Sequence, residues 1–119
     1  MIVVHATVPV ESESREEAVE AAVSVAEESR KEDGVVGYNV AVDAENENLL
    51  RFFEQYEDEA AFGEHASSEH FAEFVSKLPG FLDGEPTLTR FEFGGVRNQH
   101  VDGRVCSDHA YPRRVFVLT

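Results

Sequence analysis

The side chains best suited to chemistry gather around Glu54, His65 and His70. An imidazole with its ordinary pKa near 6.5 can accept or release a proton at neutral pH. A carboxyl group on a strand such as Glu54 either lines a pocket with a raised pKa or pairs with an arginine across the sheet. We expect the second arrangement, with Arg51 or Arg90 as the partner. The segment from Glu54 to His70 thus predicts a proton-transfer site. Its two histidines are also candidate metal ligands.

Metal binding is the weaker of these two hypotheses. Histidines that share a metal usually lie three or four residues apart on one helical face. His65 and His70 are five residues apart, so their rings would lie on different sides of a continuous helix, and Ser67 and Ser68 indicate that the helix is interrupted. We therefore expect no metal at these histidines.

The sequence does not favour nucleophilic or phosphate chemistry. It contains no glycine-rich phosphate loop and gives no support for a Ser-His-Asp site. Cys106 lies beside Asp108 and His109, which would lower the pKa of its thiol only if all three were ordered. A single cysteine cannot form an internal disulfide, which fits a reducing, cytoplasmic setting.

The elements that must position these residues can be read from periodicity. Four stretches predict strands because their side chains are β-branched or alternate in polarity: residues 2–10, 35–42, 49–56 and 87–93. Helices are predicted from a Ser14–Glu17 capping box to Gly34, over 59–65 behind the cap Asp58, and from Ser67 or Ser68 to Pro79-Gly80. Residues 43–48 predict a polar turn.

The order of these elements is β-α-β-β-α-β, which is typical of a ferredoxin-like α+β fold. In that fold an antiparallel sheet carries its helices on one face. The other face needs a cover, which predicts a homodimer packed sheet to sheet. The aromatic side chains available for this contact are Tyr38, Phe52 or Phe53, and Phe91 or Phe93.

Charge excludes several partners. Asp and Glu number 24 against 10 Lys and Arg, which gives a net charge of −14 and argues against nucleic acid. No apolar run approaches the roughly 20 residues of a membrane helix, and the first residues do not resemble a secretory signal. Acidity with only two lysines indicates either a halophilic protein from a salt-rich cytoplasm or an ordinary acidic one.

Residues 94–119 differ from the rest of the chain. They follow Gly94-Gly95 and carry four arginines against two aspartates, whereas residues 1–93 are strongly acidic. We expect one domain over 1–93 and a C-terminal tail over 94–119. Within the tail, 97–111 is expected to be mobile unless a partner chain orders it, and 114–118 is expected to be able to add a strand.

The order of motifs resembles the antibiotic biosynthesis monooxygenase family. A strand ending in Glu54-Gln55-Tyr56, then an acidic turn and His65-x4-His70-Phe71, is similar to the pattern of that family. Residues 29–38 are similar to its link between the first helix and the second strand. The resemblance covers roughly residues 1–93 and implies a dimeric α/β-barrel domain with a pocket between sheet and helices.

The resemblance also implies an activity. Better-understood relatives oxidise polycyclic phenols with O₂ without metal, flavin or haem, because the deprotonated substrate supplies the electrons. The resemblance therefore implies no cofactor. Relatives that degrade haem use a pocket tryptophan, and this chain has none. The implied site has His65 as the base, Tyr38 and Glu54 in support, and a group of substrate-binding residues, namely His5, Phe62, His70 and Phe74.

The sequence leaves alternatives open for the function of the protein and for the roles of single residues. The protein is expected to be a monooxygenase of a small electron-rich aromatic or quinol, an isomerase of a signalling metabolite, or a ligand-binding, stress-related dimer without activity. His65 could also cap or pack its helix junction, and Tyr38 could be a core or dimer aromatic. His5 faces either the pocket or the dimer contact.

Overall fold

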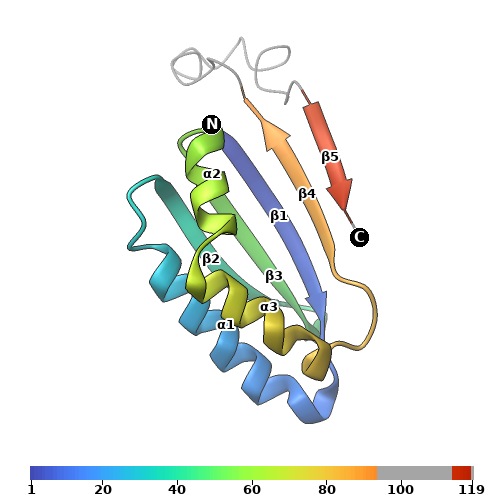
Figure 1. Ribbon diagram of the computed structural model, residues 1–119. Coiled ribbons are helices and arrows are strands. Elements are labelled where there is room, and N and C mark those ends of the chain that lie inside the picture. Colours follow the sequence, from blue (N-terminus) through green and yellow to red (C-terminus); the bar gives the residue numbers. More distant parts are fainter. Residues whose placement is uncertain (94–113, 119) are drawn as a thin grey trace.

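The computed structural model describes residues 1–93 and the backbone of 114–118. Its elements, in chain order, are β1 (Ile2–Pro9), a 3-10 helix (Ser12–Ser14), α1 (Arg15–Ser29), β2 (Val35–Asp43), β3 (Asn46–Tyr56), α2 (Glu59–Ala66), α3 (Glu69–Phe81), β4 (Thr87–Glu92) and β5 (Arg114–Leu118). The strands form one antiparallel sheet in the order β2-β3-β1-β4-β5 (Figure 1). The predicted ferredoxin-like α+β fold is confirmed.

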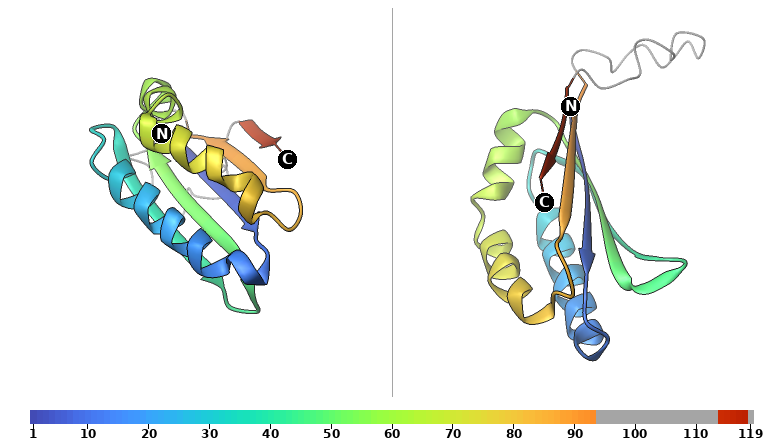
Figure 2. Two further views of the ribbon diagram at one scale, coloured as in Figure 1. Left: turned by 60° about the horizontal axis from the view of Figure 1, so that its bottom comes forward. Right: turned by 90° about the vertical axis from the view of Figure 1, so that its right-hand side faces the viewer.

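All the helices cover the same face of the sheet (Figure 2). Strand alternation explains which side chains meet them, because Leu50, Phe52, Glu54 and Tyr56 on β3 are all buried. Phe53, between them in sequence, is 45% exposed on the opposite face. Tyr38 and Phe52 are therefore core residues under the helices. Of the alternatives Phe52 or Phe53 for the uncovered face, Phe53 is the one that lies there, and Tyr38 takes its alternative place in the core.

The junction between α2 and α3 follows from two capping residues. Asp58 accepts a hydrogen bond from the Ala61 N–H at 2.9 Å, which starts α2. Ser68 accepts one from the Phe71 N–H at 3.3 Å, which starts α3. Both predicted caps are confirmed, and so is the interruption between the two helices. Because the helix is broken here, the side chains before and after the break do not follow the spacing of one continuous helix.

Three local predictions are wrong. Ser14 precedes α1, but its hydroxyl donates to the Gly80 carbonyl at 3.4 Å instead of capping the helix. Helix α3 continues through Pro79 to Phe81, because a proline near the end removes one N–H while the next turn still closes from the Leu82 N–H to the Leu78 carbonyl at 3.1 Å. The β2–β3 turn is shorter than predicted, and Asp43 tightens it by accepting from the Glu45 N–H at 3.0 Å.

The C-terminal strand β5 pairs with β4 at the edge of the sheet, as predicted for 114–118. The expected mobility of 97–111 lies outside the described residues. Among the described residues, the helices are too short or too polar to cross a membrane.

A close backbone approach holds α2 over the connection between α1 and β2. A Cβ added to Gly34 would lie 2.3 Å from the Cβ of Ala61, a distance that side chains do not tolerate. Only glycine lets this connection pass directly under α2, and the connection carries Glu32. The contact therefore positions part of the site described below.

This contact predicts opposite effects for two glycine substitutions. Gly34→Ala should lower the free energy of unfolding by about 1–3 kcal/mol because α2 must move. Gly63→Ala, in α2 with no atom within 4 Å of the added Cβ, should raise it by up to about 1 kcal/mol. Urea denaturation of both variants checks this, and an equal effect of the two substitutions would contradict the packing.

Candidate active site

A cavity of about 240 Å³ lies between the sheet and α3. Its walls are almost wholly apolar, and they come from β1, β2, β3, α3, the start of β4 and the residue before it. The lining residues are Ala6, Val8, Tyr38, Phe52, Glu54, Phe71, Phe74, Val75, Leu78, Pro86, Thr87 and Leu88. A mostly apolar cavity with a few polar groups is the usual form of a small-molecule site.

Glu54 is the one carboxyl group in the lining of this cavity. Its side chain accepts a hydrogen bond from the Tyr56 hydroxyl at 2.6 Å. Burial raises the pKa of Glu54 to about 7, although hydrogen bonds from Tyr56 and Tyr38 act in the opposite direction. The negative charge of Glu32 raises this pKa further. Glu54 can therefore exchange a proton near neutral pH.

The expected pairing of Glu54 with an arginine is wrong. Arg51 pairs with Asp43 at 2.8 Å, and Arg90 pairs with Glu59 and with Glu92. Glu54 takes the other predicted arrangement, as a pocket carboxyl with a raised pKa. Arg51 does not reach Glu54 because it is an odd number of residues away and so lies on the opposite face of β3. Arg90 on β4 lies on the same face as Glu54 but pairs with Glu59 and Glu92 instead.

Tyr38 lines the cavity and is also a core aromatic. Its ring packs edge-on against Phe52, with centroids 6.3 Å apart. Burial and the neighbouring Glu54 carboxylate both raise the pKa of its phenol far above the usual value. The hydroxyl therefore stays protonated at neutral pH and can donate a hydrogen bond.

His65 lies next to the cavity but is not part of its lining. Only 2% of its surface is exposed, and its ring contacts those of Tyr38 and Phe71 with centroids 5.3 and 4.9 Å apart. Burial lowers the pKa of the imidazole, while Glu32 raises it. His65 is thus a neutral side chain behind two residues of the cavity wall.

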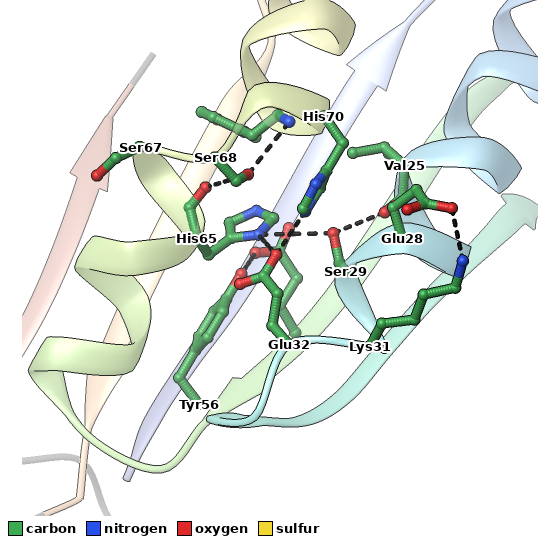
Figure 3. Close-up of polar contacts among 12 residues, drawn as sticks. Val25, Glu28, Ser29, Lys31, Glu32, Tyr56, His65, Ser67, Ser68 and His70 are labelled. Atoms are coloured by element: carbon green, nitrogen blue, oxygen red, sulfur yellow. Dashed lines mark hydrogen bonds and ion pairs between the residues drawn. The ribbon is translucent and has the colours of Figure 1, made fainter.

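Glu32 joins the two histidines (Figure 3). Its Oε2 lies 3.0 Å from Nδ1 of His65 and 2.5 Å from Nε2 of His70. A carboxylate only accepts, so both of these ring nitrogens carry the proton. The Ser29 hydroxyl donates to the Val25 carbonyl at 2.6 Å and lies 3.5 Å from the same Nδ1 of His65.

His65 and His70 do not point apart, contrary to what their spacing predicts. Their ring centroids are 6.0 Å apart, because the helix break at Ser67 redirects the chain between them. Glu32 was not singled out, although it lies inside the segment 29–38 that carries the family resemblance. Its role depends on a contact 33 positions away in sequence, for which the sequence gives no local signal.

Of the four residues expected to bind substrate, one lines the cavity and three do not. Phe74 lines the cavity. Phe62 instead packs against Tyr56, with ring centroids 5.2 Å apart, and the Arg90 guanidinium lies over the Phe62 ring. His5 lies on the opposite face of the sheet, where Nε2 is 3.4 Å from an Arg51 nitrogen.

His70 bonds to Glu32 outside the cavity lining. Phe71, which directly follows it, does line the cavity and was missed as a site residue. Near the end of β1 the helix-facing positions are Ala6 and Val8, which explains why His5 does not reach the cavity. A shift of β1 by one residue in register would have turned His5 toward the helices and Ala6 and Val8 away from them.

Comparison with known proteins agrees with the fold. The sequence model described as "Antibiotic biosynthesis monooxygenase" matches residues 1–77. The chain belongs to this family. It is 35% identical over 92 residues to "Putative monooxygenase YcnE" from Bacillus subtilis (strain 168), which covers 77% of this chain and 97% of that protein.

Two solved structures illustrate the similarity of this family member. A conserved protein from Methanosarcina mazei Go1 has a TM-score of 0.72 and 32% identity, covering 76% of this chain and 89% of that one. A protein from Deinococcus radiodurans, titled a putative antibiotic biosynthesis monooxygenase, has a TM-score of 0.75 and 21% identity, covering 79% of this chain and 93% of that one. The second comparison shows the fold alone.

Burial of Glu54 predicts a specific dependence of stability on pH. Because its pKa rises from 4.5 to about 7 on folding, the folded state binds the proton more tightly than the unfolded state. Its contribution is fully present below pH 4.5 and is lost as the pH rises through 7. The loss should amount to roughly 3 kcal/mol.

The variant Glu54→Gln isolates this contribution, since all other carboxyl groups stay the same. Between pH 4.5 and 8, the stability of the native sequence relative to the variant should fall by that amount in urea denaturation. A difference that stays constant with pH would show that Glu54 titrates normally.

Proposed function

We propose that this protein is a cofactor-independent monooxygenase that oxidises a small, electron-rich aromatic or quinol with O₂. The observation that carries the proposal is Glu54, a carboxyl group with a pKa of about 7 in the wall of an apolar cavity. Membership of the family and the name of the Bacillus subtilis relative support this class of reaction. The cavity fits an apolar ring better than a charged metabolite.

Glu54 begins the reaction as the general base. Its carboxylate takes the proton of a phenol whose carbon para to the hydroxyl bears hydrogen. In this proposal Glu54 replaces His65 as the base, because Glu54 lines the cavity and His65 does not. His65 packs against Tyr38 and Phe71 and positions these two walls.

The phenolate then supplies the electrons for O₂. One electron passes to O₂, and the resulting radical and superoxide combine to form a C–O bond at the para carbon. Protonated Glu54 returns its proton to the peroxide and then removes the proton of that carbon as the O–O bond breaks. The departing hydroxide takes up this proton, so phenol and O₂ give a quinone and water with no other reductant.

The side chains around Glu54 suit this sequence of proton transfers. Tyr56 and Tyr38 hold its carboxylate by hydrogen bonds, which prevents its pKa from rising beyond the neutral range. The apolar walls exclude water that would otherwise compete with Glu54 in these proton transfers. Tyr38 remains protonated, and its one O–H can donate to a substrate oxygen when it is not donated to Glu54.

Oxygen uptake with anthrone tests the proposal, since the enol form of anthrone is a phenol of the required kind. The ratio kcat/KM should rise with pH and level off above about 7, because only the carboxylate form of Glu54 is active. Glu54→Gln should lower kcat/KM by about 10²- to 10⁴-fold and abolish this pH dependence. His65→Gln should retain the pH profile.

Glu57→Gln is the matched control, because Glu57 is an exposed carboxyl group just beyond β3. Native-like oxygen uptake in Glu54→Gln would overturn the role of Glu54. Binding of anthrone without oxygen uptake would favour the ligand-binding alternative. Exchange of substrate protons with solvent deuterium, again without oxygen uptake, would favour the isomerase.

We also propose that the protein is a homodimer through the uncovered face of its sheet. Phe53 is 45% exposed there, and no described helix covers it. Phe53→Glu should give a monomer in sedimentation velocity, since the dimer would bury an unpaired charge. Val23→Glu, on α1 at 44% exposure, should leave the dimer intact. A monomeric native protein would contradict the proposal.

A further inference from the structure

Three metal-ligating side chains converge outside the cavity. Glu32 lies in the connection between α1 and β2, His65 in α2 and His70 in α3. One potential ligand atom from each lies within 4.8 Å of the other two. Figure 3 shows both rings directed at the Glu32 carboxylate. The proposed oxidation uses neither Glu32 nor His70.

The ligand set is the one expected for a borderline metal ion. Two imidazoles and one carboxylate form the protein ligands of several zinc sites, in which water takes the fourth position. Imidazole ligands also suit Co²⁺, Ni²⁺ and Cu²⁺, whereas Mg²⁺ and Ca²⁺ prefer oxygen. We propose that Glu32, His65 and His70 bind a divalent transition-metal ion of the Zn²⁺ class.

The present distances are close to those that a metal requires. Glu32 Oε2 is 3.0 Å from the His65 nitrogen and 2.5 Å from the His70 nitrogen, with protons in between. Ligands at about 2.0–2.1 Å from a tetrahedral ion lie roughly 3.3 Å apart. The two histidine nitrogens lie up to 4.8 Å apart. To admit the ion, each ring must carry its proton on its other nitrogen, Glu32 must open from each ring by less than about 1 Å, and the rings must approach one another by up to about 1.5 Å.

An unpaired polar atom is a second observation in favour of a ligand. Within residues 1–93, Oε1 of Glu32 is buried without a hydrogen-bond partner. It gives the carboxylate a second ligand atom. The Glu32 and His70 side chains are 17% and 24% exposed, so an ion can enter from solvent, while His65 is 2% exposed and forms the inner wall.

The metal would connect elements that are separate in sequence. It would join the α1–β2 connection to the junction of α2 and α3. Phe71 follows His70 directly, and its ring lies 4.9 Å from that of His65 and lines the cavity. Binding would therefore fix one cavity wall without placing the metal in the reaction. The proposal does not depend on the oxygenase activity.

Titration of the full chain with Co²⁺ and Zn²⁺ tests the site. Co²⁺ should bind one ion per chain with the intense visible absorption of four-coordinate cobalt, and Zn²⁺ should displace it. Glu32→Gln and His70→Ala should each weaken binding by more than the roughly 10- to 100-fold that loss of an outer hydrogen-bond partner costs. Both positions are partly exposed, so these variants should fold, which circular dichroism checks.

Two control variants remove other possible donors. His5→Ala removes the histidine on the opposite face, and a triple variant, His100→Ala, Cys106→Ser and His109→Ala, removes those of the tail. Both should bind Co²⁺ as the native chain does. Absence of saturable binding, or binding that the triple variant loses and Glu32→Gln retains, would overturn the proposal.

Discussion

The burial of one carboxyl group is the constraint on which the rest of the site depends. Glu54 occupies a helix-facing position of β3 that an apolar residue would otherwise fill, and only 7% of it is exposed. Burial disfavours its charge, while two tyrosine hydroxyls stabilise that charge. Their balance leaves a group that can either take or return a proton at neutral pH. An apolar cavity beside it supplies space for a substrate.

A second cluster, formed by Glu32, His65 and His70, is held by the same fold and interacts electrostatically with Glu54. The negative charge of Glu32 raises the pKa of Glu54, although the two side chains belong to different clusters. Glu32 is fixed by the passage of Gly34 under Ala61 and by hydrogen bonds to two histidines. Phe71 links the clusters by packing, because it touches His65 and lines the cavity.

The sequence predicts those features that residues close together in the chain determine. Alternation identified the strands, and Asp58 and Ser68 identified the start of two helices, because a cap acts within three residues. It did not predict the surroundings of Glu54, which depend on register across the sheet, or the side on which His5 lies. Nor did spacing predict that His65 meets His70, because the angle at Ser67 decides it. Glu32 was missed because its contacts are entirely tertiary.

The central claim is that Glu54 titrates near neutral pH in the wall of the cavity. A ¹³C NMR titration of the Glu54 carboxyl carbon measures this directly, with assignment by comparison to a Glu54→Gln sample. The account predicts a midpoint near pH 7, well above the ordinary value of 4.5. A midpoint at that ordinary value would contradict it, since a solvated carboxylate would then occupy the position assigned to the base.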